Sequence, residues 1–531
     1  MAVFFYVETL FFIFLEKFRI LKKYLLVVLP IFIITSCVSV KRYNEKIETP
    51  VAAEQLKDDV DFAYKNLQRL HPQLFWYIDR PELDHKFDSL KSTINQPLKP
   101  NDFFWKLAPV IAEIKEAHLR LVPLQKRLTQ KEIRRLKNQR GLFSRFSYLV
   151  DGSRLIVTDN PERVANMNTG TEILKINDLP VTEMLQKYRQ LTNSDGENTT
   201  FQKYILARRW PTYFTTEYGI SDSVKLVTKY CDTLHHFYLK REAITTKTRK
   251  KEEAAERKIL NTEKGKTKDY NPTTKSYNRE LRFLSADSSI AYMRIKTFSG
   301  RHSMKFYKES FSEIKKRGAK YLILDIRENF GGSLAEINNL YSYLVSDRFE
   351  FIKDIEVTSR TSMFEARYLS EFPLVLKPLA IVGYPFYLVG TALSVKKEDD
   401  RFYLRNNGFF ALKNPKDEHF SGKIYVLING GSFSAASILP SKLKYEKKAL
   451  LVGEETGGAN DGTVAGRYAI KKLPSSKLPL PIGLMLIQPN IEFSHTKKGV
   501  VPHHEILPSS EDVLRKKDIQ LEWVLNHIKH Q

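Results

Sequence analysis

The stretch Gly430-Gly-Ser-Phe-Ser434-Ala-Ala-Ser437 is the one from which we interpret the rest of the chain. It lies between an apolar run at 424–428 and a helix-like run at 435–443, so a buried strand should lead through a tight glycine turn into a helix. That geometry places the Ser434 hydroxyl at the mouth of a sheet, beside the unpaired N–H groups of a helix start. The same pattern also fits an ordinary Ser/Gly turn with a capping serine.

Two further stretches have a similar design. One is Tyr321-Leu-Ile-Leu-Asp325-Ile-Arg-Glu-Asn-Phe-Gly331-Gly332-Ser, and the other is Leu451-Val-Gly453-Glu-Glu-Thr-Gly-Gly. With the serine turn, and in this order, they resemble the core of the C-terminal processing (tail-specific) and tricorn-type serine peptidases. The resemblance extends from about residue 289 to the C-terminus, with weaker matches upstream.

The resemblance implies a mixed α/β fold with a crotonase-like (Clp protease-like) core of stacked ββα units, which we place at 286–531. The alternation of strand-like and helix-like runs after residue 288 agrees with such a core. It also implies hydrolysis of a polypeptide substrate by a serine nucleophile, with no cofactor and no metal.

A serine hydroxyl is a poor nucleophile near neutral pH and needs a base. The lysine-dyad branch of the family has a lysine after the third motif, where this chain has Ala459. Lys442 and Lys444 follow Ser434 on the same helix and should point away from its hydroxyl. A Ser–His mechanism is the remaining option.

The base that we predict is His118, near the end of a helical region that we place at 38–135. Glu116-Ala-His118-Leu resembles the segment that carries the base in the tricorn-like branch, without its Gly and Thr. A third helix should end at 117–121, so His118 could instead be a surface histidine that a helix C-terminus favours.

Glu492 is the predicted acid that orients the imidazole, because it lies just before Gly499-Val-Val-Pro, which matches a run that follows the acid in the His-using branch. A surface glutamate in a strand is an equally good interpretation, and Glu454 and Glu455 are alternative acids, although their match to the third motif suggests a structural role. The oxyanion hole should combine the N–H of Ala435 with that of Gly331 or Gly332. Ser437 stands where the family often has Glu, which counts against full activity.

Residues 136–239 are strand-rich, and their Gly-x-x-Ile-x-x-Ile-Asn pattern is similar to the PDZ domains inserted in this family. Residues 240–285 are rich in Lys and Arg and poor in apolar residues, which predicts a solvated basic linker. The net charge of +24 is spread along the chain without a nucleic-acid motif, so we predict no nucleic-acid partner.

Residues 1–37 have the pattern of a targeting segment. Basic residues precede an apolar run at 24–34 that is too short to span a bilayer comfortably, and Ile34-Thr-Ser-Cys37 resembles the lipobox of bacterial lipoproteins. The resemblance implies lipidation of Cys37 and a location in the cell envelope, anchored to a membrane. An ordinary signal peptide or membrane anchor is the alternative.

The sequence leaves three functions open. The first is an envelope-anchored serine endopeptidase that uses Ser434 and His118. The second is a catalytically weak or inactive relative that binds peptides or apolar ligands, since fold alone does not fix function. The third is an esterase-like hydrolase with the same Ser–His pair.

Overall fold

The computed structural model describes most of the chain after residue 38. The described residues are 39–245, 250, 253–254, 269–271, 276–366, 368, 372–373, 376–405, 411–492 and 496–531. The predicted targeting segment 1–37, with Cys37, lies outside them. Within the described ranges, no helix combines the length and the apolar character that crossing a bilayer requires.

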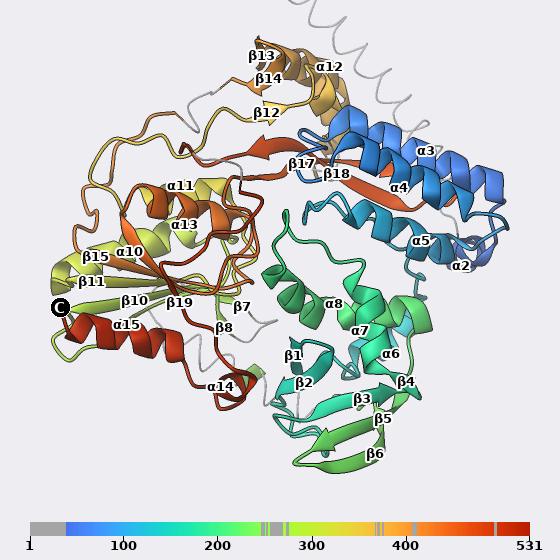
Figure 1. Cartoon of the computed structure of the whole chain (residues 1–531), viewed down its shortest axis with the longest axis horizontal. Coiled ribbons are helices and arrows are strands. Elements are labelled where there is room, and N and C mark those ends of the chain that lie inside the picture. The colour runs from blue at the N-terminus through green and yellow to red at the C-terminus, as the bar shows by residue number, and fades with distance from the viewer. Residues whose placement is uncertain are drawn as a thin grey trace, which may run out of the picture.

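The centre of the C-terminal half is a six-stranded sheet (Figure 1). Its strands pair in parallel from β10 to β19, and only β9 is antiparallel. Their order across the sheet is β19 (His504–Glu505), β16 (Ala449–Gly453), β15 (Lys423–Ile428), β11 (Tyr321–Asp325), β10 (Ile290–Ile295) and β9 (Arg279–Phe283).

Helices cover both faces of this sheet, because its strands are apolar on both sides. Along β11, Leu322 and Leu324 contact one apolar cluster and Ile323 contacts another, as the two-residue period of a strand requires. Figure 1 shows helices on both sides of this sheet, where they pack against these two clusters. These are α10 (Ser303–Arg317), α11 (Leu334–Tyr341) and α13 (Ala435–Tyr445), opposed by α15 (Ile519–Lys529), which follows the short α14 (Ser510–Leu514). The predicted mixed α/β class is therefore confirmed.

The segment 240–285, which we predicted to be a solvated linker, is not a linker over its whole length. Its last part, Arg279–Phe283, forms the edge strand β9 of the main sheet, and Arg279 is buried in ion pairs with Asp269 and Glu336. Short strands β7 (Tyr270–Asn271) and β8 (Ser276–Tyr277) pair just before it. The basic composition hid this, because a buried arginine with two carboxylates resembles a solvated charge in sequence.

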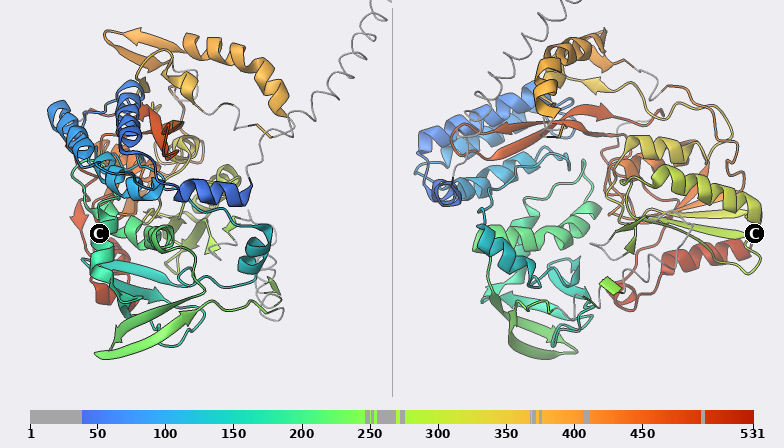
Figure 2. Two further views of the ribbon diagram at one scale, coloured as in Figure 1. Left: turned by 90° about the vertical axis from the view of Figure 1, so that its right-hand side faces the viewer. Right: turned by 180° about the vertical axis from the view of Figure 1, so that it is seen from behind.

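A second sheet joins the C-terminal half to the N-terminal helices. Its order is β13 (Val395–Glu398), β14 (Arg401–Leu404), β12 (Glu356–Val357), β18 (Pro479–Ile487) and β17 (Thr463–Lys472). Helix α3 contacts both β17 and β18, and Asp59 on α3 accepts the N–H groups of Ser475 and Ser476. Figure 2 shows this packing from two further sides. The N-terminal helices are α2 (Val40–Glu48), α3 (Ala53–Leu70), α4 (Arg80–Ser92), α5 (Pro100–Ala112) and α6 (Gln130–Lys137).

Helix α5 ends earlier than the sequence predicts. It stops at Ala112, and Lys115 has a left-handed φ of 57°, which the helix cannot continue through. His118 therefore lies in a turn that follows the helix, and the prediction of a histidine at a helix end is wrong. In this turn the ring is positioned by tertiary contacts.

The region 136–239 folds as an antiparallel sheet with two helices. The strand order is β1 (Ser147–Asp151), β2 (Arg154–Asp159), β3 (Glu172–Ile176), β5 (Ser223–Tyr230) and β6 (Thr233–Lys240), with β4 (Leu179–Pro180) on β3. The helices are α7 (Val181–Arg189) and α8 (Thr200–Tyr218). The interior of this region is aromatic, with Trp210 fully buried against Phe143.

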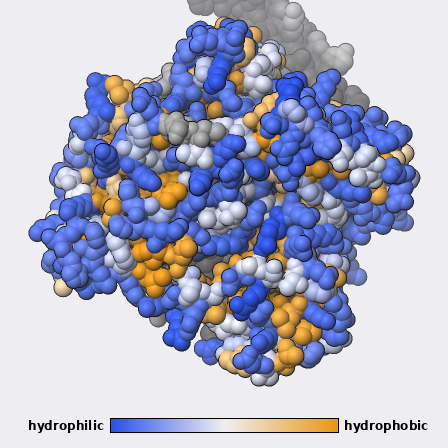
Figure 3. Space-filling view, in the orientation of Figure 1, coloured by the Kyte–Doolittle hydropathy of each residue, from blue (hydrophilic) through white to orange (hydrophobic). Residues whose placement is uncertain are grey.

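The surface agrees with a charge that is spread over the molecule. Figure 3 shows a largely hydrophilic face with separate hydrophobic areas. Helix α12 (Lys377–Leu393), which follows the short 3₁₀ helix Ser362–Glu365, is different, because its outer side is apolar. Its exposed residues include Leu379, Val382, Phe386, Val389 and Leu393.

Candidate active site

The three glycine-containing motifs meet at one edge of the main sheet. They follow β11, β15 and β16, which are neighbours and parallel, so their C-terminal ends lie side by side. In open α/β sheets this edge is where ligands bind. The predicted strand–turn–helix around Ser434 is present, with β15 ending at Ile428 and α13 beginning at Ala435.

Hydrogen bonds between the loops fix the shape of the serine turn. The N–H of Phe433 donates to Asn329 O at 3.0 Å, and Ser432 Oγ donates to Ile326 O at 2.9 Å. From the other side, Gly457 N–H donates to Ser432 O at 3.0 Å. The turn is therefore held from both neighbouring loops.

Ser434 has an unusual backbone conformation. Its φ of 59° and ψ of −123° lie outside the regions that side-chain-bearing residues usually occupy. Such strain persists only where the surroundings impose it, and it clusters at active sites. Ser434 is the N-cap residue of α13, yet its side chain makes no capping hydrogen bond, and the residue is partly exposed. The structure thus presents a hydroxyl and does not use it as a cap.

The predicted oxyanion donors differ in their availability. Ala435 is the first residue of α13, and its N–H has no acceptor among the described residues. Gly331 lies against the serine, since a Cβ there would meet Ser434 Cβ at 2.8 Å and Ala435 N at 3.0 Å, but its N–H already donates to Asn329 Oδ1. A Cβ on Gly332 would instead meet Phe298 O at 2.2 Å. Ala435 is the donor with the clearest geometry.

The turn that carries His118 is held in place by the loop that precedes α8. Asp195 Oδ1 accepts the N–H of Ala117 at 2.8 Å, and Asp195 Oδ2 accepts that of Ala459 at 3.2 Å. Asn193 Nδ2 donates to Leu119 O at 3.2 Å. Asp195 therefore links the His118 turn to Ala459, the residue that follows the third motif.

The imidazole lies beside the serine turn. Its ring stacks on that of Phe433, the residue before Ser434, with centroids 4.5 Å apart and an angle of 28°. His118 Nδ1 lies 2.9 Å from Thr463 Oγ1, at the start of β17. Within the described part of the chain, no hydrogen bond joins His118 to Ser434. When Nδ1–H donates to Thr463, Nε2 holds the lone pair of a base.

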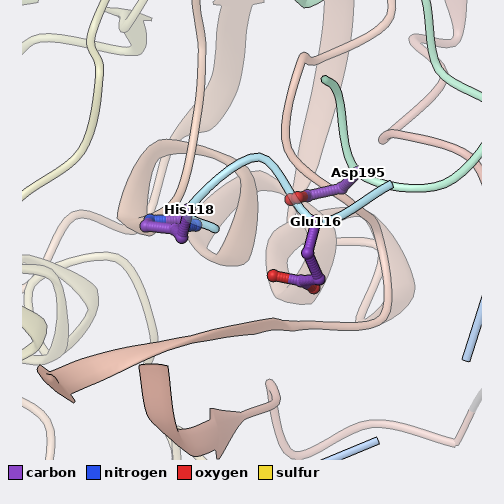
Figure 4. Close-up of side chains that lie close together, drawn as sticks. All are labelled: Glu116, His118 and Asp195. Carbon is purple, nitrogen blue, oxygen red and sulfur yellow. The ribbon is translucent and has the colours of Figure 1, made fainter. Parts of the chain in front are cut away.

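Two buried carboxyl groups lie next to this histidine (Figure 4). Glu116, His118 and Asp195 each offer an atom, and these atoms lie within 4.8 Å of one another. Burial is the main cause that raises the pKa of Glu116, and the neighbouring carboxylates raise it further. Burial also raises the pKa of Asp195, although the backbone N–H groups that donate to its carboxylate act in the opposite direction. The three residues are close enough to hold a metal ion, but both Asp195 oxygens and His118 Nδ1 already have partners.

The structure does not bring Glu492 to His118. Glu492 is exposed, and no described contact joins it to the imidazole. Lys442 Nζ donates to Asn490 O at 2.8 Å and Lys444 Nζ to Val501 O at 2.6 Å, so both point away from Ser434 as expected. Ser437 Oγ donates to Ser434 O at 2.8 Å, within the first turn of α13.

Sequence reasoning missed the residues that position His118. These are Asn193 and Asp195 in the loop before α8, and Thr463, which follows the third motif closely. The first two stand in the polar run Asn193-Ser-Asp195-Gly-Glu-Asn198, a signal for an ordered loop that could have been noticed. Thr463 carries no local signal, because its role depends on the packing of β17 against the N-terminal region.

Comparison with known proteins agrees with this arrangement, since residues 289–506 match peptidase family S41. That part of the chain is a domain of this family. No curated protein sequence matches it. The prediction of a serine-type peptidase of the tail-specific or tricorn kind is therefore confirmed.

Solved structures of mature CPAF share the fold of this chain. Mature CPAF has a TM-score of 0.54 at 15% identity, over 87% of this chain and 94% of that one. Mature CPAF complexed with lactacystin has a TM-score of 0.56 at 16% identity, over 90% and 98%. The photosystem II D1 C-terminal processing protease has a TM-score of 0.41 at 16% identity, over 88% and 99%.

The first prediction concerns the pH dependence of the peptidase. Burial, with a further effect of the Arg209 charge, lowers the pKa of His118 to about 4. A base must be neutral, so the lowered pKa keeps His118 competent well below neutral pH. We expect kcat/KM to stay level from pH 7 towards pH 5 and to fall with an apparent pKa near 4. Circular dichroism at each pH checks that the chain stays folded, and an acid limb near pH 6.5 would contradict the assignment.

The second prediction concerns Thr463. Thr463→Val removes the hydroxyl that orients the imidazole at nearly constant volume, so we expect kcat to fall about tenfold or more, within the ~10²–10⁴-fold range of general-base catalysis. Thr463→Ser keeps the hydroxyl and should retain most of the activity. The measurement is kcat for both variants beside their thermal unfolding temperatures. Equal kcat values for the Val and Ser variants would remove Thr463 from the mechanism.

Proposed function

We propose that this S41 peptidase is a serine endopeptidase in which His118 activates Ser434. The observation that carries the proposal is the pairing of a strained, uncapped serine with an imidazole that stacks on the adjacent residue. These two features come from chain segments more than 300 residues apart, which only a shared site explains well.

The mechanism follows from the hydrogen-bond arrangement. His118 Nε2 takes the proton of Ser434 Oγ as the oxygen attacks the peptide carbonyl carbon, and the Ala435 N–H stabilises the resulting oxyanion. The imidazolium then gives its proton to the leaving amine, and the acyl-enzyme remains. Water hydrolyses the acyl-enzyme with His118 again as the base. Thr463 holds Nδ1–H throughout, the role that we first gave to Glu492.

The Ser–His contact has to form on substrate binding. Catalytic hydrogen bonds are often long or poorly aligned in free enzymes and tighten in the complex. A rotation about the Cα–Cβ bond of Ser434 is available, because no capping bond holds the side chain. A neutral His118 is ready to accept the proton without first losing one.

We also propose the finer architecture that the sequence suggests. The repeated strand–helix order β10–α10–β11–α11 and β15–α13–β16 supports a crotonase-like core. The antiparallel sheet β1–β6 with α7 and α8 supports a PDZ-like region. In a PDZ domain a peptide adds a strand to a sheet edge, and β1 and β6 are the edges of this sheet.

Attachment to a membrane through Cys37 remains a proposal that the sequence alone supports. The basic residues, the apolar run 24–34 and the cysteine stand in the order that lipoprotein processing needs. An anchored enzyme in the cell envelope would act on polypeptides that reach that membrane surface.

The third prediction tests this anchor. In a bacterial host, full-length chain should incorporate labelled fatty acid and sediment with membranes, and Cys37→Ser should abolish the label. Cys231→Ser is the matched control and should keep it, because Cys231 is exposed in a strand turn far along the chain. Labelling that survives Cys37→Ser would refute lipidation at this residue.

A catalytically weak relative that binds peptides is the second candidate function. The observation in its favour is that His118 and Ser434 are not hydrogen-bonded in the described structure. Such a protein would bind peptide near the serine turn without turnover. The two functions differ in whether Ser434 reacts.

The fourth prediction separates them. Wild-type chain should hydrolyse unstructured protein substrates and label with a fluorophosphonate, and Ser434→Ala and His118→Ala should each lose at least about 10³-fold in rate. Ser437→Ala is the matched control one turn away and should keep labelling at Ser434, since its hydroxyl donates only to a backbone carbonyl. Binding of peptide without labelling or hydrolysis by the wild type would establish the second function.

A further inference from the structure

Helix α12 has an apolar stripe that no described part of the chain covers. Figure 1 shows the helix near the top of the view. The residues of the stripe recur every three or four positions, so they lie along one side of the helix. Each is more than half exposed, and the Phe386 side chain reaches 79%. They are Leu379, Val382, Phe386, Val389 and Leu393.

The opposite side of α12 packs against the protein. Ala380 is buried, and the rings of Tyr384 and Tyr387 contact that of Tyr368. The helix also contacts the 3₁₀ helix Ser362–Glu365 and strand β13. The outer side of α12 is therefore more apolar than its inner side, which is the reverse of what a helix facing water shows. An exposed apolar surface of this kind marks an interaction site.

Four cations lie beside this stripe. Lys377 begins α12, and Arg360 and Arg405 hydrogen-bond to the backbone just after its last residue. Arg467 donates to the hydroxyl of Tyr387 at 2.9 Å. None of the four forms an ion pair with another described residue, and α12 itself contains no acidic residue.

The acids near α12 are already paired. Glu365 in the neighbouring 3₁₀ helix forms ion pairs with Arg69 and Lys471. Within the β13–β14 hairpin, ion pairs join two lysines to two of its acids. The charge around the stripe that lacks a partner is therefore positive.

We propose that α12 is an interfacial helix that lies in the surface of a membrane containing anionic lipids. The stripe would enter the acyl region, and the four cations would lie at the level of the headgroup phosphates. A helix of this length whose inner side contacts the protein lies in the surface and does not cross the bilayer. The proposal goes beyond the peptidase function and does not depend on it.

Charge favours lipid over a second copy of this chain as the partner. In a symmetric dimer the same patch meets itself, so two α12 helices would bring Lys377, Arg360 and Arg405 of both copies together. Anionic headgroups would instead neutralise these residues. The net charge of +24 acts in the same direction, because it opposes self-association and attracts the chain to an anionic surface.

The anchor proposed above would act together with α12. The described structure begins at Ser39, which caps α2 and stands two residues after Cys37. Anchoring at Cys37 would leave almost no tether, so the folded part would stay at the bilayer, where the effective concentration of lipid is high. Stable attachment to a membrane commonly needs two such signals.

The position of α12 would also bring the active site close to the lipid surface. Arg467, which bonds to α12, lines a cavity of about 580 Å³ beside His118 together with Arg120 and Arg209. An α12 that lies in the membrane surface would therefore favour polypeptide substrates at that surface over those free in solution.

The fifth prediction places a probe on α12 in the full-length chain. Cys37→Ser and Cys231→Ser remove the native thiols, and with them any lipidation, and Phe386→Cys carries an environment-sensitive fluorophore. Vesicles of phosphatidylglycerol and phosphatidylcholine should shift its emission to the blue, and lipids spin-labelled near the headgroup should quench it. The same fluorophore at Tyr238→Cys, on an exposed part of β6, is the matched control and should show neither change.

Variants of the bordering cations test the electrostatic part. In the chain with the probe at residue 386, Lys377→Gln and Arg405→Gln should each lower the affinity for these vesicles about fivefold, as loss of a basic residue near an anionic surface implies. Arg134→Gln on α6 has an equal charge change and should alter nothing. Vesicles of phosphatidylcholine alone should bind more weakly and should not distinguish these variants.

Two results would overturn the proposal. One is an emission at residue 386 that the anionic vesicles leave unchanged. The other is a blue shift that appears without lipid as the protein concentration rises, with a doubled mass in light scattering, which would assign the stripe to a second copy of the chain. Ser434→Ala should insert into vesicles as the wild type does, so failure of the peptidase function would leave this result intact.

Discussion

The carboxylate of Asp195 is the contact on which the arrangement of the site depends. Its two oxygens accept N–H groups from Ala117 and Ala459, and so join the turn that carries His118 to the loop that follows β16. The groups involved come from three separate parts of the sequence. Because the carboxylate is fully buried, its two hydrogen bonds are strong, and losing either would leave a costly unpaired group.

The rest of the site is built on this connection. The main sheet supplies the serine turn at its carboxyl edge, and the neighbouring loops hold that turn in a strained conformation. The second sheet supplies Thr463, and the helical region supplies the imidazole. The proposed nucleophile and base thus come from different parts of the chain and lie beside the same turn, without a continuous structural element between them.

The charged groups around His118 differ between its buried side and its exposed side. Behind the histidine lie two buried carboxyl groups, and burial raises their pKa. In front of it lie arginines without acidic partners among the described residues. At the carboxyl end of β11, Asp325 is neutralised by Arg294 and Arg327, which hold its pKa low. The net positive charge of the chain is therefore not uniform in effect, because the arginines around the cavity beside His118 have no acidic partners among the described residues.

The sequence by itself determined the parts of this protein that are local. Three apolar runs that each end in glycines predicted three strands with tight loops, and Gly430-Gly-Ser-Phe-Ser434 predicted the serine turn, because turn and strand preferences act over a few residues. Tertiary structure alone decided where α5 ends, that Arg279 is buried, and that Thr463 rather than Glu492 contacts His118. These depend on packing between separate segments, up to 345 residues apart for His118 and Thr463, and no spacing rule in a single sequence records which distant side chain will fill a given place.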